Sequence, residues 1–201
     1  MGENASGIIN FLFEVGILAK TPRSGFHFLG SGQQSVAEHV HRVVYVGWVL
    51  ATLEGADVAK VMKMCLLHDL AEARTSDLNY VHQKYAHADE RSAIQDLAKT
   101  LAFGGEMLEL LNELKERKTK EAIITKDADQ VEWILSLKEQ LDIGNSRAAT
   151  WIPPAVKRLK TERAQALAEQ VLQTDSDAWW YSDKESDWWV NRDKKSTQKR
   201  F

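Results

Sequence analysis

Three places in this 201-residue chain put groups that can bind a metal on helical faces that are otherwise apolar. They are His39, the adjacent pair His68-Asp69, and Asp127. Burying one ionisable side chain without a partner costs several kcal/mol, so four of them facing a core need a common solution. A divalent cation is one such solution, because it binds neutral imidazole and carboxylate oxygen together. Two His and two Asp leave positions open for water, as a catalytic metal site requires.

The order of these groups is more specific than any one of them. A single histidine on an apolar face is usually a hydrogen-bonded core residue, and a His-Asp pair often occurs by chance. Here the set consists of a histidine, a long gap, a His-Asp pair, a second long gap and an aspartate, and each lies on a predicted helix.

The elements that carry these groups are all predicted to be helical. Apolar residues at helical spacing predict helices over about 7–19, 36–53, 58–70, 86–103, 105–117, 119–140 and 154–173. Ser35 and Glu38 form a capping box before the second helix, and Pro153-Pro154 open the last one. The third helix is apolar all round and is therefore predicted to be buried, with His68 and Asp69 at its end. No segment shows the alternation of a strand, so the predicted fold class is all-α.

Composition excludes several classes of protein. The formal net charge is −3 and the pI is about 6.1, which argues against a protein that coats nucleic acid or an anionic membrane. A single cysteine, Cys65, excludes an internal disulfide framework and suits a reducing compartment. No apolar run reaches the roughly 20 residues that span a bilayer. We therefore expect a cytoplasmic protein that binds neither nucleic acid nor membrane.

The chain is predicted to divide into a domain over 1–174 and a polar, Trp-rich tail over 175–201. The tail holds four of the seven tryptophans, as Trp179-Trp180 and Trp188-Trp189. Paired tryptophans in a polar tail can pack on the body, on a partner chain or on a nucleobase.

Four motifs give the chain a specific resemblance over roughly residues 7–172. They are 35–39 (SVAEH), 66–72 (LLHDLAE), Asp77, and 126–129 (KDAD). In these motifs the chain resembles the HD-domain metal-dependent phosphohydrolases, a helical-bundle family with a buried metal site. Within that superfamily it is most similar to the 5'-deoxynucleotidases, which remove phosphate from deoxynucleoside 5'-monophosphates. The resemblance also implies a homodimer, which the exposed tryptophans favour.

The resemblance implies that one divalent ion, Co²⁺, Mn²⁺ or a similar metal, is held by His39, His68, Asp69 and Asp127. Asp69 is then both a ligand and a catalytic residue. Glu72, four residues after His68, is implied to handle protons near the attacking water. The alternative to this catalytic role is that Glu72 is a solvated carboxylate at a helix end.

Three further residues are implied to bind the substrate. Arg23 helps to hold the phosphate, Asp77 faces the sugar 3'-hydroxyl, and Phe26 is the aromatic residue that follows the arginine. The alternatives are a surface charge for Arg23 and a cap or turn residue for Asp77. The extra histidines His82 and His87 leave open a second metal, although their polar setting disfavours it.

Two other functions stay open from the sequence. An HD site also supports a phosphodiesterase or a nucleoside-triphosphate hydrolase, which would need a basic cluster for the additional phosphates. No dense basic cluster lies near the motifs, where Arg74 and Lys84 are the nearest candidates, and this disfavours both functions. The third possibility is a non-catalytic nucleotide sensor or partner-binding module that docks through the tryptophan pairs.

Overall fold

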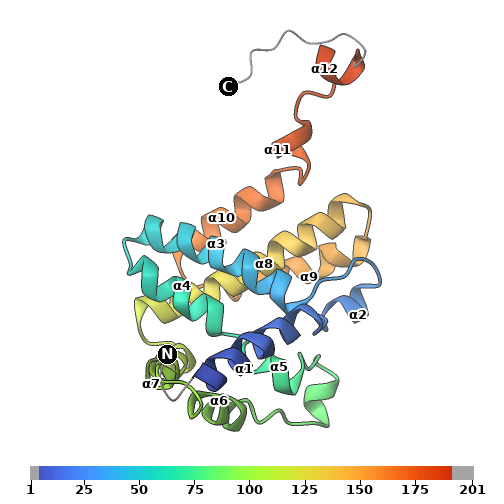
Figure 1. The fold of residues 1–201 in the computed structure, drawn as a ribbon. Helices are drawn as coiled ribbons and strands as arrows, with labels where there is room; N and C mark the ends of the chain where they lie inside the picture. Colours follow the sequence, from blue (N-terminus) through green and yellow to red (C-terminus); the bar gives the residue numbers. More distant parts are fainter. Residues whose placement is uncertain (1–4, 192–201) are drawn as a thin grey trace.

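The computed structural model describes residues 5–191, which form helices joined by short loops (Figure 1). Within those residues there is no strand, only one isolated backbone bridge between Pro22 and Ser35, so the all-α prediction is confirmed. The elements are α1 Ala5–Val15, η1 Gly16–Ala19, α2 Phe26–Leu29, α3 Val36–Glu54, α4 Val58–Leu67, α5 Glu72–Thr75, η2 His82–Lys84, α6 Glu90–Ala98, α7 Gly104–Glu116, α8 Lys120–Asp142, α9 Ser146–Val156, α10 Glu162–Gln173, α11 Ala178–Tyr181 and α12 Asp187–Val190.

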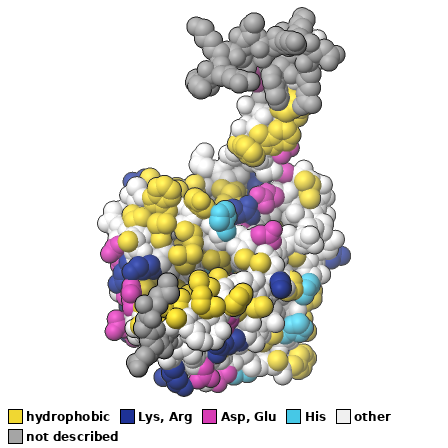
Figure 2. All heavy atoms as spheres, in the orientation of Figure 1, with side chains coloured by type: hydrophobic (Ala, Val, Ile, Leu, Met, Phe, Trp, Pro, Cys, Tyr) yellow, Lys and Arg dark blue, Asp and Glu magenta, His cyan; other side chains and the backbone are white. Residues whose placement is uncertain are grey.

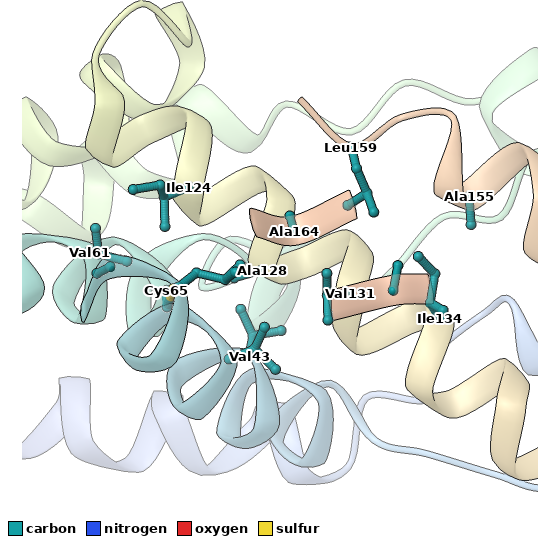
Figure 3. Packing of buried hydrophobic residues seen from close by; sticks show 14 residues of the cluster. Val43, Val61, Cys65, Ile124, Ala128, Val131, Ile134, Ala155, Leu159 and Ala164 are labelled. Carbon is teal, nitrogen blue, oxygen red and sulfur yellow. The ribbon is translucent and has the colours of Figure 1, made fainter. Parts of the chain in front are cut away.

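Helix α8 is the centre of the fold. It packs against α3, α4, α7, α9 and α10, so apolar residues lie on several of its faces. Figure 3 shows the main core, where Val131 and Ile134 of α8 lie beside Val43 of α3 and Ala164 of α10. Because α8 is buried on several sides, a polar residue on it can face the core in more than one direction.

Helix α3 begins where the capping box predicts. The N–H of Glu38 donates to Ser35 Oγ at 3.2 Å, and the N–H of Ser35 donates to the Glu38 carboxylate at 2.6 Å. The helix ends at Gly55, whose left-handed backbone (φ 63°) favours glycine. These two ends fix the register that turns His39 into the protein.

Helices α3 and α4 approach each other closely at Gly47. A Cβ on this glycine would lie 2.5 Å from Cys65 Sγ, so a side chain there would push the helices apart. Helix α4 ends at Leu67, earlier than the predicted 58–70, and His68 caps it. The chain then turns sharply, with Glu72 N–H donating to the Asp69 carbonyl, before the short helix α5. The close packing therefore brings the end of α4 to the start of α3.

The prediction of one helix over 154–173 is wrong. The structure has α9 followed by a separate α10, and Pro153 and Pro154 lie inside α9 rather than at a helix start. Asn145 caps α9 by accepting from the N–H of Arg147, while Thr161 caps α10. Proline is typical of a first helical turn, which is why the sequence pattern misplaced this boundary.

After α10 the chain continues away from the bundle (Figure 1). Trp180, Tyr181 and Trp189 contact one another there, with ring centroids 4.9–5.7 Å apart. The rest of the predicted tail, residues 192–201, and the side chain of Trp188 lie outside the described residues. In the described part of the chain, no helix has both the length and the apolar character to cross a membrane.

Candidate metal centre and adjoining cavity

Two imidazole rings from different helices meet at the centre of the site. His39 Nε2 and His68 Nε2 are 3.3 Å apart, and both side chains are fully buried. Asp69 Oδ2 lies 3.2 Å from His68 Nε2 and 3.5 Å from His39 Nε2. The fourth group is Asp129 of α8, whose Oδ1 lies 3.2 Å from His39 Nε2. The ligand atoms of His39, His68 and Asp129 all lie within 4.8 Å of one another.

The Nδ1 atoms of both rings already have partners, and these partners determine what the Nε2 atoms can bind. His68 Nδ1 lies 2.7 Å from the carbonyl oxygen of Cys65, which only accepts, so this nitrogen carries the proton. His39 Nδ1 lies 2.5 Å from Glu132 Oε2. Both Nε2 lone pairs therefore point into the group of carboxylates. A carboxylate or carbonyl behind a ligating histidine is the usual outer support of a metal site, so these residues fit a divalent cation.

The electrostatics of the group also require a positive charge. Burial alone would lower the pKa of His39, but its hydrogen bonds to Asp129 and Glu132 raise it to about 9. Burial would raise the pKa values of Asp69 and Asp129, yet the two histidines hold both below their ordinary range. The ammonium group of Lys126, 3.2 Å from the Asp129 carboxylate, also lowers the pKa of Asp129. Without a metal, a proton on His39 occupies the place where a cation is needed.

We therefore expect metal affinity to rise with pH between about 6 and 9. A metal needs the free Nε2 lone pair of His39, which is protonated below its pKa of about 9. Binding must then release a proton, and affinity falls by up to about tenfold for each unit of acidification. Isothermal titration with Mn²⁺ in two buffers of different ionisation enthalpy measures that release. A metal affinity that does not change across this pH range would contradict competition between the metal and a proton for His39 Nε2.

The structure does not bring the predicted ligand Asp127 to this group. Its buried carboxylate instead accepts from Thr161 N–H at 2.7 Å, Thr161 Oγ at 2.8 Å and Lys160 N–H at 2.9 Å. It thus binds the start of α10 and ties that helix to α8. The carboxylate that meets the histidines is Asp129, two residues further along the same motif, and we correct the predicted ligand set accordingly.

The sequence pattern missed a polar stripe on α8. Asp129, Glu132 and Ser136 recur at helical spacing and face α3, while the apolar stripe that contains Asp127 faces α10. Glu132 Oε1 accepts from Arg42 Nη2 at 2.9 Å, Gln34 Nε2 at 2.8 Å and Ser136 Oγ at 3.0 Å. The signal in the sequence was the pair of carboxylates three residues apart on a buried helix.

The structure places Arg23 and Asp77 next to Asp69, at the edge of this group. Arg23 Nη1 is 3.3 Å from Asp69 Oδ2 and 3.2 Å from Asp77 Oδ2, so the guanidinium joins the two carboxylates. Burial disfavours the charge of Arg23, but Asp69, Asp77 and Asp129 raise its pKa. Asp77 also accepts from the N–H and the hydroxyl of Ser24, at 3.0 and 3.1 Å. These bonds hold the 23–25 turn beside the histidines.

Glu72 begins α5 and lies in the same electrostatic environment. Burial and the negative charges of Asp69 and Asp77 raise its pKa to about 9. Its Oε2 is buried and has no hydrogen-bond partner among the described residues. A carboxyl group in this state holds its proton at neutral pH and is free to give it to another group.

A cavity of about 280 Å³ opens next to Arg23 and Asp77. Phe28, Tyr80, Trp133 and Trp151 give it aromatic walls, and the cationic residues along its lining are Arg23 and Arg158. The Arg158 guanidinium is 3.2 Å from Tyr80 Oη and 3.4 Å from Gln130 Oε1.

Phe26, the predicted substrate contact, is not in the cavity lining. It packs edge-on against Trp133 at 5.7 Å in the cluster that contains Leu29. Phe28 takes the place at the cavity because the turn of α2 directs these two residues to different sides.

The residues that the sequence left as alternatives lie outside the group. His82 and His87 are exposed and do not belong to the described metal-binding cluster. Cys65 is buried in the core, and burial raises its pKa to about 12, which excludes it as a nucleophile.

Comparisons with known proteins lead to the same family that the sequence motifs resemble. The HD domain family matches residues 15–171. The 5'-deoxynucleotidase HDDC2 of Bos taurus is 29% identical over 150 residues, which cover 72% of this chain and 73% of that protein. A conserved hypothetical protein from Pyrococcus furiosus is 28% identical with a TM-score of 0.68, covering 83% of this chain and 99% of that one. A predicted metal-dependent phosphohydrolase from Magnetospirillum magnetotacticum shares the fold at 20% identity, with a TM-score of 0.66 and coverage of 85% and 91%.

Fold and site together define an all-α protein in which His39, His68 and Asp129 form a group that could hold a metal ion, with a cavity next to Arg23. The chain belongs to the HD domain family of metal-dependent phosphohydrolases. The resemblance found in the sequence motifs is confirmed at this level.

Proposed function

We propose that this protein is a metal-dependent phosphomonoesterase that hydrolyses deoxynucleoside 5'-monophosphates to deoxynucleoside and phosphate. The observation that carries the proposal is the aromatic cavity that opens directly beside Arg23 and Asp77. The 5'-deoxynucleotidases among its relatives, 26–33% identical, support the same substrate class.

The cavity favours a monophosphate of a nucleoside over larger substrates. Its volume of about 280 Å³ lies just below the roughly 300–1,000 Å³ of typical small-molecule pockets, which favours a small substrate. Its aromatic walls suit the flat faces of a nucleobase, which stack on such side chains. With Arg23 and Arg158 as its cationic lining residues, it lacks the basic cluster that a triphosphate requires.

Four residues are proposed to hold the metal: His39, His68, Asp69 and Asp129. When bound, a divalent cation lowers the pKa of a coordinated water and polarises a phosphoryl oxygen. Arg23, which lies between Asp69 and Asp77, is proposed to clamp the phosphate oxygens as charge redistributes. Asp77, fixed by Ser24 on the cavity wall, has acceptor capacity left for a sugar hydroxyl.

Glu72 is proposed to deliver the proton that the departing 5'-oxygen needs. Because its raised pKa keeps the carboxyl protonated near neutral pH, it meets the requirement of a general acid. Glu72→Gln is therefore expected to lower kcat about 10²–10⁴-fold. Mn²⁺ affinity, measured by titration calorimetry, should stay within a factor of a few. Activity close to that of the wild type would exclude this role.

The substrate class is tested by phosphate release from a panel of nucleotides. The purified chain is stripped with a chelator and reloaded with Co²⁺, Mn²⁺, Mg²⁺ or Zn²⁺. We expect release from deoxynucleoside monophosphates to exceed release from ribonucleoside monophosphates. Deoxyribose 5-phosphate, which lacks a base, is expected to be the poorer substrate. Preference for triphosphates or phosphodiesters would contradict the proposal, and binding without turnover would indicate a sensor.

We also propose that the chain works in the cytoplasm as a homodimer, with residues 1–174 as the catalytic domain and 175–201 as a tail. The family match ends at residue 171, which supports the division. The one cysteine is buried and free, which suits a reducing compartment.

A further inference from the structure

The cavity beside Arg23 and Asp77 carries a second set of polar groups, which the proposed chemistry does not use. They belong to Tyr80 in the loop after α5, to Gln130 of α8, and to Arg158 just after α9. The surface over α1, α3 and α4, by contrast, is dominated by hydrophobic side chains (Figure 2). A ligand that is recognised by hydrogen bonds therefore finds its partners in the cavity and not on that surface.

The fold sets these polar groups beside the aromatic walls of the cavity. On α8, Gln130 lies three residues before Trp133, so the two side chains share one side of the helix and both line the cavity. Along α9, Trp151 and Pro154 line the cavity at helical spacing, and Arg158 follows four residues after Pro154. A flat ring that stacks on these walls would therefore have its edge close to polar side chains.

Two uncharged partners hold Arg158 in place. Its Nη1 donates to Gln130 Oε1 at 3.4 Å, and its Nη2 donates to Tyr80 Oη at 3.2 Å. No carboxylate of the described residues lies within ion-pair distance of Arg158, whereas Arg23 lies between two. A guanidinium has more N–H donors than these two contacts use, so Arg158 keeps donors for a ligand.

The same two contacts fix what Gln130 and Tyr80 can offer. Because a guanidinium only donates, the amide oxygen of Gln130 must face Arg158, and its NH₂ group remains available on the cavity wall. The Tyr80 hydroxyl accepts from Arg158 and can therefore donate its own proton. All three residues then present hydrogen-bond donors to a ligand in the cavity.

A set of donors selects a nucleobase by the acceptors on its edge. Guanine and hypoxanthine carry a carbonyl oxygen at C6 beside the N7 acceptor, and thymine and uracil carry one at C4. Adenine and cytosine carry an amino group at these positions, which would set donor against donor. Arginine pairs with the O6 and N7 atoms of guanine in this way when proteins read DNA.

We propose that Tyr80, Gln130 and Arg158 form a base-recognition subsite that prefers carbonyl-bearing nucleobases to amino-bearing ones. Arg158 sets the preference, because its planar fork of N–H groups matches two neighbouring acceptors. It is a specificity residue and touches none of the reacting atoms. The inference rests on the proposed function, since it names the deoxynucleotides that the same site takes.

Binding of deoxynucleosides to the manganese-loaded full chain tests the subsite apart from catalysis. Deoxyinosine and deoxyadenosine serve as probes, because their bases differ by a carbonyl or an amino group at C6 and neither has a phosphate to lose. Titration calorimetry is expected to show about tenfold tighter binding of deoxyinosine. The values of kcat/KM for phosphate release from the two corresponding 5'-monophosphates should differ in the same direction.

Three variants separate the hydrogen bonds of Arg158 from its charge. Arg158→Lys keeps the charge but removes the planar fork, and we expect it to bring the two dissociation constants close together. Arg158→Gln should have the same effect. Lys157→Gln is the matched control, because it removes a positive charge from the preceding exposed residue, which does not line the cavity. It should keep the tenfold preference, and circular dichroism verifies that each variant is folded.

Three results would overturn the proposal. The first is equal binding of the two deoxynucleosides by the wild type, or binding of neither. The second is a preference that survives in both folded Arg158 variants. The third is an Arg158→Gln variant that loses turnover of monophosphates but binds deoxynucleosides as the wild type does, which would assign Arg158 to the phosphate. A protein that prefers deoxyinosine but releases phosphate from no nucleotide with any metal would keep the subsite and exclude the proposed function.

Discussion

Asp129→Asn is expected to abolish metal-dependent phosphate release. The substitution keeps the size of the side chain but removes the negative charge that lies 3.2 Å from His39 Nε2. A metal would then have three of the proposed ligands and one charge fewer to balance its own. We expect metal affinity to fall by more than the roughly 10–100-fold that outer-shell changes cost, and activity to fall with it. Titration calorimetry with Mn²⁺ and phosphate release measure the two effects.

Asp127→Asn is the matched control, two residues away on the same helix. Asp127 accepts three hydrogen bonds from the start of α10, so its loss of charge weakens the tie between α8 and α10. Thermal unfolding should show a loss of about 1.5–3 kcal/mol, since hydrogen bonds to charged groups are worth that much. Metal affinity should be unchanged. If Asp127→Asn loses the metal and Asp129→Asn keeps it, the ligand assignment fails.

Glu132→Gln is expected to have the second-largest effect, although Glu132 does not touch the proposed metal position. Glu132 lies behind His39, and three donors hold its other oxygen. A neutral amide there no longer fixes the His39 ring through a charged hydrogen bond, and it leaves Arg42 with one carboxylate fewer. We expect metal affinity to drop about 10–100-fold. The free energy of unfolding should also fall, because the charged hydrogen bonds of Glu132 are lost. The loss should be limited to about 1–3 kcal/mol, since Arg42 is partly exposed to solvent.

Glu139→Gln controls for Arg42 alone. Glu139 pairs with the same guanidinium at 2.5 Å but on its solvent side, where it is about half exposed. This variant should keep the metal affinity of the wild type and lose little stability. If Glu132→Gln binds the metal as tightly as Glu139→Gln and the wild type do, the contact of Glu132 with His39 has no effect on metal binding.

The local sequence signals predicted the elements with their own start and stop residues well. Ser35 and Glu38 marked the start of α3. The apolar residues of 58–70 predicted a helix that is buried all round, whereas α4 ends at Leu67, buries Val61, Met64 and Cys65, and leaves Leu66 exposed. The positions of His39, His68 and Asp69 could be predicted as well, because each of the three lies near a helix end that the sequence marks. Arg23 and Asp77 were placed by the resemblance, and the structure brings both beside Asp69.

What the sequence could not decide is which side of a helix that is buried on several sides faces which neighbour. On α8, Asp127 and Asp129 lie on different faces, and both faces are buried. Only the packing of α3 on one side and α10 on the other separates Asp129, the proposed metal ligand, from Asp127, which binds the start of α10. The same ambiguity hid Glu132, whose partners Gln34 and Arg42 are about 90 residues or more away in the chain. Phe26 and Phe28 differ likewise, by which side of one helical turn meets Trp133.

The most direct test of the account is a crystal structure of the chain loaded with Mn²⁺, with anomalous data collected at the manganese edge. We expect one strong anomalous peak within coordination distance of His39 Nε2, His68 Nε2, Asp69 and Asp129. We also expect Asp127 to accept hydrogen bonds from Thr161 at the start of α10, as in the structure described above. A peak at Asp127, or none between the two histidines in a protein that binds manganese in solution, would contradict it.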